Sequence, residues 1–325
     1  MATHLQQPTR RARTALGASG HRVTIDGVSL AFDEEGAGPD VVCLHAIGHG
    51  AADFLSLRRR LCDRYRVLAL DWPGQGSSGD DHVPASAIRY ARLLEGFLAA
   101  TGVTRPVLIG NSIGGAVALR HAAEHPDRVT ALVLENPGGL AATDDVLSRT
   151  ALAAMARFFA AGARGARWFP RAFAAYYRLF VLRRAAAVAQ RRAIVASAFE
   201  IAPVLEQAWR SFATSEADIR ALVPRITCPV LFAWAARDQF VQLGRSLPAI
   251  RRFPNARLEK FPAGHAAHLE TPAAFEALVE RFLADTAPPA RSRGPHEGDA
   301  GLEPREGGPE TEVDAVPEGE LVLRV

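Results

Sequence analysis

The residues at 110–115, Gly-Asn-Ser-Ile-Gly-Gly, constrain the fold more than any other stretch of this 325-residue chain. An apolar run typical of a β-strand precedes them at 106–109, and a run that favours a helix follows at 116–123. Glycines two positions before and after Ser112 let the strand and the helix approach closely at a sharp turn. Such a turn exposes the serine hydroxyl and places the first amides of the helix beside it. The sequence therefore predicts a nucleophilic serine at Ser112.

The rest of the chain alternates short apolar strands with helices. A hairpin is expected over 21–33 with its turn at Asp26-Gly27. Further strands are predicted at 40–44, 65–70, 106–109, 129–134, 230–234 and 256–261, and helices near 52–62, 85–100, 116–123 and 272–284. This alternation indicates an α/β fold with a mostly parallel central sheet and helices on both faces.

The alternation stops between 140 and 223, where the sequence has helical character and no strand signal. We therefore expect a core formed by 21–139 and 224–285, with 140–223 as a helical insertion. Residues 1–20 are polar and rich in arginine and predict a flexible arm. Residues 286–325 are acidic, rich in proline and glycine and without periodicity, which predicts a disordered tail.

Charge and cysteine content exclude several classes of protein. The net charge is only +3 and no basic patch is interleaved with aromatic residues, which argues against nucleic-acid binding. Three widely spaced cysteines indicate free thiols in a reducing compartment, so a cytoplasmic location is expected. We expect no secretory signal and no transmembrane segment, because neither the first twenty residues nor the remainder holds a suitable apolar run.

A serine nucleophile needs a base to take its proton and a carboxylate to orient that base. Both groups are expected in loops that follow later strands of the sheet. Asp238 follows the strand predicted at 230–234, and His265 follows the strand predicted at 256–261. Ser112, Asp238 and His265 thus occur in the order nucleophile, acid, base.

With these motifs, the chain resembles the α/β-hydrolase superfamily over about 21–284. The stretches that carry the resemblance are Leu-His-Ala-Ile-Gly at 44–48, Asp-Trp-Pro-Gly-Gln-Gly-Ser-Ser at 71–78, the serine turn at 110–115, Ala-Arg-Asp at 236–238, Ala-Gly-His at 263–265 and Leu-Glu-Thr-Pro at 269–272. The resemblance implies a hydrolase that needs no cofactor or metal. It also implies that the insertion is a cap domain, placed before the strand that bears the acid.

The resemblance further implies an oxyanion hole made by the backbone N–H groups of Ile47 and Ile113. Ala46 departs from the family pattern, in which a glycine follows the histidine. His45 is mostly structural in the family, so it is kept out of proton transfer. His49 also departs from the pattern and is interpreted as a polar loop residue.

Two alternatives remain for the acid and the base. Glu135 is the second candidate for the acid because some family members place it after that strand, while Asp238 has the simpler interpretation of capping a helix near 239–240. His268 competes with His265 for the role of base, although it is expected in the first turn of a helix.

The insertion is also strongly basic. No acidic residue lies between Asp145 and Glu200, whereas ten arginines do: Arg149, Arg157, Arg164, Arg167, Arg171, Arg178, Arg183, Arg184, Arg191 and Arg192. One interpretation is a solvated surface on which arginine stems cover apolar area. The other hypothesis is that arginines face the pocket and attract a small substrate that bears a carboxylate.

The resulting prediction is a serine hydrolase that acts on a small carboxylic ester through an acyl-enzyme. The stretches 110–115 and 137–140 also resemble carbon–carbon hydrolases of aromatic ring-fission products, and cofactor-free perhydrolases or oxygenases share a similar triad. Serine at the turn argues against dehalogenases and epoxide hydrolases, which place aspartate there. A non-catalytic binding protein, a lipase acting at membrane interfaces and a homo-oligomer are left open.

Overall fold

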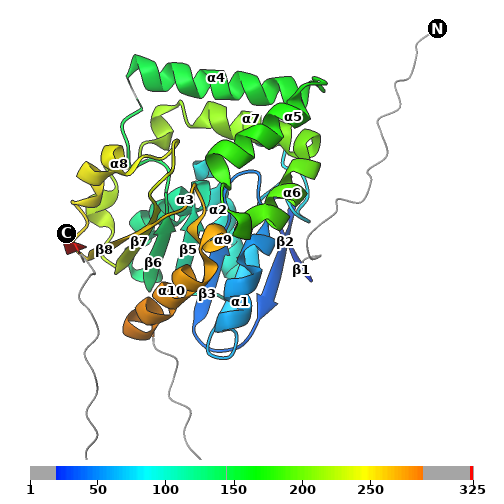
Figure 1. Ribbon diagram of the computed structural model, residues 1–325. Helices are drawn as coiled ribbons and strands as arrows, with labels where there is room; N and C mark the ends of the chain where they lie inside the picture. Colours follow the sequence, from blue (N-terminus) through cyan, green and yellow to red (C-terminus); the bar gives the residue numbers. More distant parts are fainter. Residues whose placement is uncertain (1–19, 144, 288–322, 325) are drawn as a thin grey trace, which may run out of the picture.

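A computed structural model describes residues 20–143 and 145–287 together with the backbone of 323–324. The described strands form one sheet in the order β1-β2-β4-β3-β5-β6-β7-β8-β9 (Figure 1). Their bounds are β1 His21–Ile25, β2 Val28–Glu35, β3 Asp40–Leu44, β4 Arg66–Leu70, β5 Val107–Asn111, β6 Ala131–Glu135, β7 Val230–Ala235, β8 Ala256–Phe261 and β9 Leu323–Arg324. Strands β3 to β8 run parallel, whereas β1, β2 and β9 pair antiparallel with their neighbours. The predicted mostly parallel sheet is confirmed.

The hairpin at the edge of the sheet forms as its turn sequence predicts. Asp26 and Gly27 both adopt positive φ angles, 48° and 77°, which is the backbone of a two-residue turn between twisted strands. The hairpin joins the sheet through β2, which pairs with β4.

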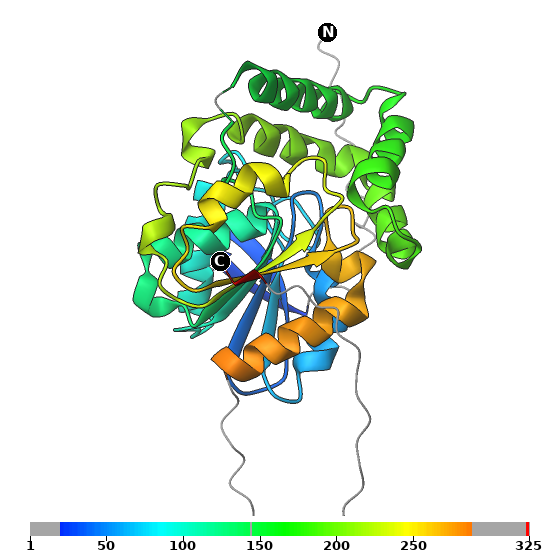
Figure 2. The same ribbon diagram turned by 60° about the vertical axis from the view of Figure 1, so that its left-hand side comes forward.

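Helices cover both faces of the sheet. Their bounds are α1 Leu55–Leu61, α2 Ala87–Ala100, α3 Ile113–Glu124, α8 Leu243–Ile250, α9 Ala267–Glu270 and α10 Pro272–Thr286. Side chains of α2, α3 and α8 belong to one hydrophobic cluster, and those of α1 and α10 to the other, across the sheet (Figure 2). Strand β5 serves both clusters: Leu108 packs into the first, while Val107 and Ile109 pack into the second. The two-sided burial explains why the central strands are continuous apolar runs.

The helical insertion between β6 and β7 lies over the end of the sheet at which the parallel strands finish (Figure 1). It contains α4 Val146–Ala163, α5 Phe169–Tyr176, the π-helical turn η3 Tyr177–Val181, α6 Val188–Ala196 and α7 Ala198–Ser211. Helix α4 lies alongside α7 (Figure 1). The insertion has an aromatic core of its own, in which the rings of Phe159, Phe169 and Phe173 are fully buried and contact one another.

Some of the expectations differ from the structure or lie outside it. Helix α8 was considered only as a helix near 239–240 that Asp238 would cap, and it begins instead at Leu243. Of the predicted arm, only Gly20 belongs to the described residues. Of the predicted tail, only the end of α10, the residue after it and strand β9 do. All three cysteines are free, but Cys62 is only partly buried. Within the described ranges, no helix is both long enough and apolar enough to cross a membrane.

Candidate active site

Ser112 lies at the junction between β5 and α3 with a φ of 56°, a backbone angle that residues other than glycine rarely adopt. The neighbouring backbone explains why glycine stands on either side of it. A Cβ atom on Gly110 would lie 2.6 Å from the carbonyl carbon of Gly114, and one on Gly114 would lie 2.2 Å from the carbonyl oxygen of Leu44. The turn is further held by the Ser112 N–H, which donates to the carbonyl oxygen of Glu135 at 2.9 Å. The strand–turn–helix predicted from the glycine spacing is therefore present.

Asp238 and His265 come together from two loops that follow neighbouring strands, β7 and β8. The distance from Asp238 Oδ2 to His265 Nδ1 is 2.7 Å. The other carboxylate oxygen, Oδ1, accepts hydrogen bonds from the N–H groups of Phe240 and Val241. Asp238 thus bonds to loop amides and contacts His265 at the same time, but it caps no helix at 239–240, because α8 begins only at Leu243. Although burial favours the neutral imidazole, the carboxylate of Asp238 raises the pKa of His265 above its ordinary value.

Asn136 is a residue of this site that the sequence did not reveal. It follows β6 with a φ of 41°, a conformation that asparagine tolerates better than most residues. Its Nδ2 donates to Asp238 Oδ2 at 2.9 Å, and its Oδ1 accepts from the N–H of Ala235 at 2.7 Å. Asn136 therefore holds the acid against the end of β7. The only signal in the sequence was its position two residues after the end of the strand predicted at 129–134.

Two further side chains hold the loop that carries His265. Asn111 Nδ2 donates to the carbonyl oxygen of His265 at 3.0 Å, which ties the serine turn to the histidine loop. Glu270 accepts from the N–H of Gly264 at 2.8 Å and from the N–H of Arg184 at 3.1 Å. Glu270 thereby connects the histidine loop to the helical insertion.

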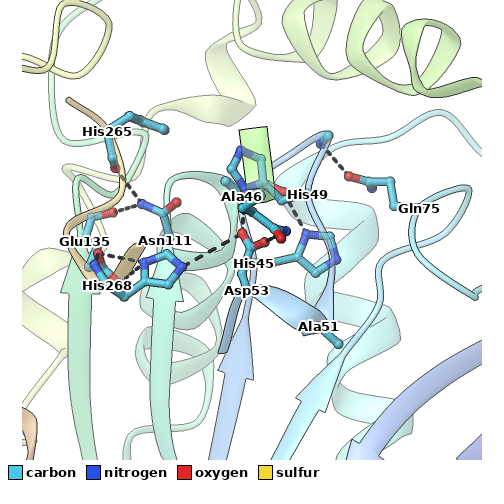
Figure 3. Close-up of polar contacts among 12 residues, drawn as sticks. His45, Ala46, His49, Ala51, Asp53, Gln75, Asn111, Glu135, His265 and His268 are labelled. Carbon is cyan, nitrogen blue, oxygen red and sulfur yellow. Dashed lines mark hydrogen bonds and ion pairs between the residues drawn. The ribbon is translucent and has the colours of Figure 1, made fainter. Parts of the chain in front are cut away.

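The alternative acid and base pair with each other instead of with Asp238 and His265. Glu135 Oε1 lies 2.9 Å from His268 Nδ1, and its Oε2 accepts from the His268 N–H at 3.1 Å (Figure 3). His268 is not among the described residues that line the cavity containing Ser112. Although burial opposes the charge, the carboxylates of Glu135 and Asp53 raise the pKa of His268 to about 10. The pair is therefore a buried ion pair beneath the site.

The loop after β3 is held by His45 and Gln75. His45 Nδ1 lies 2.7 Å from the carbonyl oxygen of Ala46, and its Nε2 accepts from the N–H of Trp72 at 2.9 Å. Gln75 Oε1 accepts from the N–H of Gly48 at 2.5 Å. Both bonds of His45 go to backbone groups, which agrees with the structural role expected for it.

Ile47 and Ile113 both line the cavity beside Ser112. Ile113 is the first residue of α3, so its N–H has no partner within the helix. Ile47 lies in the loop held by His45 and Gln75. The two residues named as oxyanion donors thus flank the serine from different segments of the chain.

The cavity contains Ser112 and His265 and is otherwise mostly apolar. The insertion contributes much of its wall, including Leu152, Tyr176, Tyr177, Leu205 and Trp209. None of the described residues that line it is an arginine. The hypothesis that arginines of the insertion face the pocket is therefore wrong. Their long stems lie elsewhere: Arg184 Nη1, for example, donates to the carbonyl oxygen of Pro262 and Arg191 Nη1 to that of Leu182.

His49 lies in the loop after β3, as expected, but the sequence did not reveal its burial. It was interpreted as a polar loop residue, but it is only 5% exposed and lines the cavity. Its Nδ1 lies 2.5 Å from Asp53 Oδ2 (Figure 3). A second histidine–aspartate pair therefore lies beside the same cavity, with His49 in its wall.

Comparison with known proteins finds a match to the model of the alpha/beta hydrolase family over residues 41–278. The pimeloyl-[acyl-carrier protein] methyl ester esterase of Chromobacterium violaceum is 30% identical, over 78% of this chain and 98% of that protein. The 2-hydroxy-6-oxo-6-phenylhexa-2,4-dienoate hydrolase of Burkholderia cepacia is 29% identical, over 78% of this chain and 91% of that protein.

Solved structures show the same similarity. The crystal structure of a membrane phospholipase A, described as a bacterial virulence factor, matches with a TM-score of 0.70 and 25% identity over 82% of this chain and 85% of that chain. A thermophilic esterase from Thermogutta terrifontis matches with a TM-score of 0.68 and 22% identity, over 82% of this chain and 98% of that chain, which bears on the fold alone.

Proposed function

Because the chain belongs to the α/β-hydrolase family, we propose that it is a serine hydrolase that cleaves neutral carboxylic esters. Ser112 is the nucleophile, His265 the base and Asp238 the residue that orients His265. The observation that supports this proposal best is the short contact between Asp238 and His265 in a cavity that His265 shares with Ser112. The esterase among the relatives supports the same class of reaction.

In the proposed mechanism, His265 Nε2 takes the proton of the Ser112 hydroxyl while Ser112 Oγ attacks the ester carbonyl carbon. The contact with Asp238 keeps the other ring proton on Nδ1, which leaves the lone pair on Nε2. The negative charge that develops on the carbonyl oxygen is stabilised by the N–H groups of Ile47 and Ile113. His265 then protonates the leaving alcohol, and water resolves the acyl-enzyme with His265 again as base.

The lining of the cavity supports a neutral substrate with an apolar acyl group. Tyr176, Leu205 and Trp209 from the insertion provide apolar surface, and the described lining offers no arginine to a carboxylate. In this proposal the insertion over 140–223 is the cap that encloses the substrate. Apolar contact is a weak discriminator between chain lengths, so a range of esters is expected to react.

The carbon–carbon hydrolase from Burkholderia cepacia suggests a second reaction for the same triad. Its name specifies a dienoate, which is a carboxylate, and carboxylates are commonly bound by arginine. The described cavity lining provides none. Ester hydrolysis is therefore the function that the site supports better, and the perhydrolase or oxygenase alternative has no observation in its favour.

Hydrolysis of p-nitrophenyl esters of graded acyl length tests the proposal. We expect turnover by the native protein and its loss in Ser112→Ala. Ser246→Ala is a matched control, because Ser246 is a buried serine on α8 that is not among the residues lining the cavity, and it should retain the native rate. Turnover that survives Ser112→Ala would exclude the proposed nucleophile. Labelling of Ser112 by a fluorophosphonate without ester turnover would favour a different substrate for the same serine.

A further inference from the structure

His49 stands close to the reaction centre, although the proposed mechanism does not use it. It follows the proposed oxyanion donor Ile47 by two residues, and two residues span at most about 7 Å of chain. His49, Ile47 and Ser112 all line the same cavity. Figure 3 shows the ring of His49 above Asp53, on the opposite side of the network from His265.

The contact with Asp53 determines which nitrogen of His49 carries the proton. Burial disfavours the charge of Asp53, but His49 and His268 lower the pKa of this carboxyl group well below its usual range. The ionised carboxylate can only accept hydrogen bonds, so Nδ1 of His49, 2.5 Å away, is the donor. A neutral ring then has its lone pair on Nε2, as in the pair formed by His265 and Asp238.

The carboxylate of Asp53 is itself held from several sides. Gln190, on α6 of the insertion, donates from Nε2 to Asp53 Oδ1. His268 Nε2 lies 3.9 Å from Asp53 Oδ2. The ring of His49 also packs against that of Tyr177, with centroids 5.8 Å apart. The orientation of His49 is therefore set before any substrate binds.

Nε2 of His49 has no hydrogen-bond partner among the described residues. Beside it, a Cβ atom on Gly48 would meet the methyl groups of Leu205 and the hydroxyl of Tyr177, whose side chains also line the cavity. The side chain of His49 is only 1% exposed, and an acceptor so nearly enclosed is stabilised when a donor reaches it. A substrate that brings a hydroxyl group to this position would supply the donor.

We propose that His49 is a substrate-contacting residue whose Nε2 accepts a hydrogen bond from a hydroxyl group near the reacting ester carbonyl. Asp53 is its positioning residue. The protein therefore favours hydroxylated esters over their deoxy analogues. This inference rests on the proposed ester hydrolysis at Ser112.

The test compares kcat/KM for methyl butyrate, methyl 2-hydroxybutyrate and both enantiomers of methyl 3-hydroxybutyrate, followed by acid release. For each variant, the kcat/KM of a hydroxylated ester is divided by the kcat/KM of the deoxy ester. This ratio is then divided by the same ratio for the native protein, which cancels the intrinsic reactivity of the esters. His49→Leu should lower the ratio roughly tenfold for at least one hydroxylated ester, since a buried hydrogen bond is lost. His49→Gln, whose amide oxygen can still accept, should retain part of the preference.

Asp53→Asn separates positioning from packing. An asparagine amide can donate to Nδ1 and move the ring proton to Nε2, which then donates to the substrate hydroxyl instead of accepting from it; the preference for hydroxylated esters should therefore change in size while the packing of the ring is kept. Tyr177→Phe is the matched control on the same wall and should change all four esters by a common factor. Should His49→Leu fail to fold, as judged by circular dichroism, His49→Gln and Asp53→Asn carry the same comparison.

The outcomes separate this inference from the proposed function. An unchanged ratio for every hydroxylated ester in folded His49 or Asp53 variants would overturn the role of His49 while ester hydrolysis stands. A fall of the ratio in Tyr177→Phe equal to that in His49→Leu would also overturn it, since the wall in general would then set the preference. No turnover of any ester by the native protein would overturn both proposals.

Discussion

Replacement of Gly114 by alanine tests whether the close approach of α3 to β3 holds the candidate active site together. The added Cβ would lie 2.2 Å from the carbonyl oxygen of Leu44 and 2.7 Å from its carbonyl carbon. These are backbone atoms, so no side chain can rotate away. Ordinary contact begins at 3.4 Å, and the helix and the strand must therefore separate by about 1 Å.

The expected cost follows from two opposing effects. Alanine in a helix is favoured over glycine by about 1 kcal/mol. Overpacking against rigid neighbours costs about 1–3 kcal/mol, and more where the backbone has to move. The net loss of stability should therefore be about 0–2 kcal/mol, and larger where the backbone has to move. The same displacement moves Ser112 relative to the loop that carries Ile47, and a 1 Å misplacement can lower kcat about 100-fold.

Gly244→Ala is the matched control for this prediction. Gly244 lies in α8, and nothing within 4 Å would meet an added Cβ. This variant should gain up to about 1 kcal/mol. Thermal unfolding and p-nitrophenyl ester turnover of the two variants provide the comparison. A Gly114→Ala protein as stable and as active as Gly244→Ala would refute the steric reasoning.

Three further predictions concern the groups around the candidate site. Asn136→Ala removes a hydrogen bond to Asp238 at 2.9 Å and should lower kcat about tenfold or more. The free energy of unfolding, measured by thermal unfolding, should fall by about 1–3 kcal/mol. The acid limb of the pH profile for kcat/KM should lie above pH 6.5, because the pKa of His265 is raised, and Asp238→Asn should move it to lower pH as kcat falls; a native limb below pH 6.5 would contradict this. His268→Gln should destabilise the protein by about 3–5 kcal/mol at neutral pH, because it leaves buried Glu135 without its cation. Since the pKa of His268 is raised to about 10, the contribution of His268 to stability is complete below pH 6.5 and is lost as the pH rises through 10. The free energies of unfolding of the native protein and of His268→Gln should therefore converge above that pH.

Several features of the fold could be predicted from the sequence because they depend on residues that are neighbours along the chain. The Asp26-Gly27 turn needs two positive φ angles, which this pair tolerates. The serine turn needs glycines at 110 and 114, because any Cβ there would meet the backbone. The continuous apolar strands indicate a sheet buried on both faces. The extent of helix α8 was not predicted, because Pro248 lies within it and proline usually ends a helix.

The sequence by itself thus determined the sheet, the serine turn and the chain order of Ser112, Asp238 and His265. Only the tertiary structure decided that Glu135 pairs with His268, that the arginines of the insertion stay out of the described cavity wall, and that His49 faces the cavity with Asp53 behind it. The physical reason is the range over which each property is set. Backbone conformation follows from local sterics, whereas the partner of a side chain depends on segments that packing brings together from far along the chain.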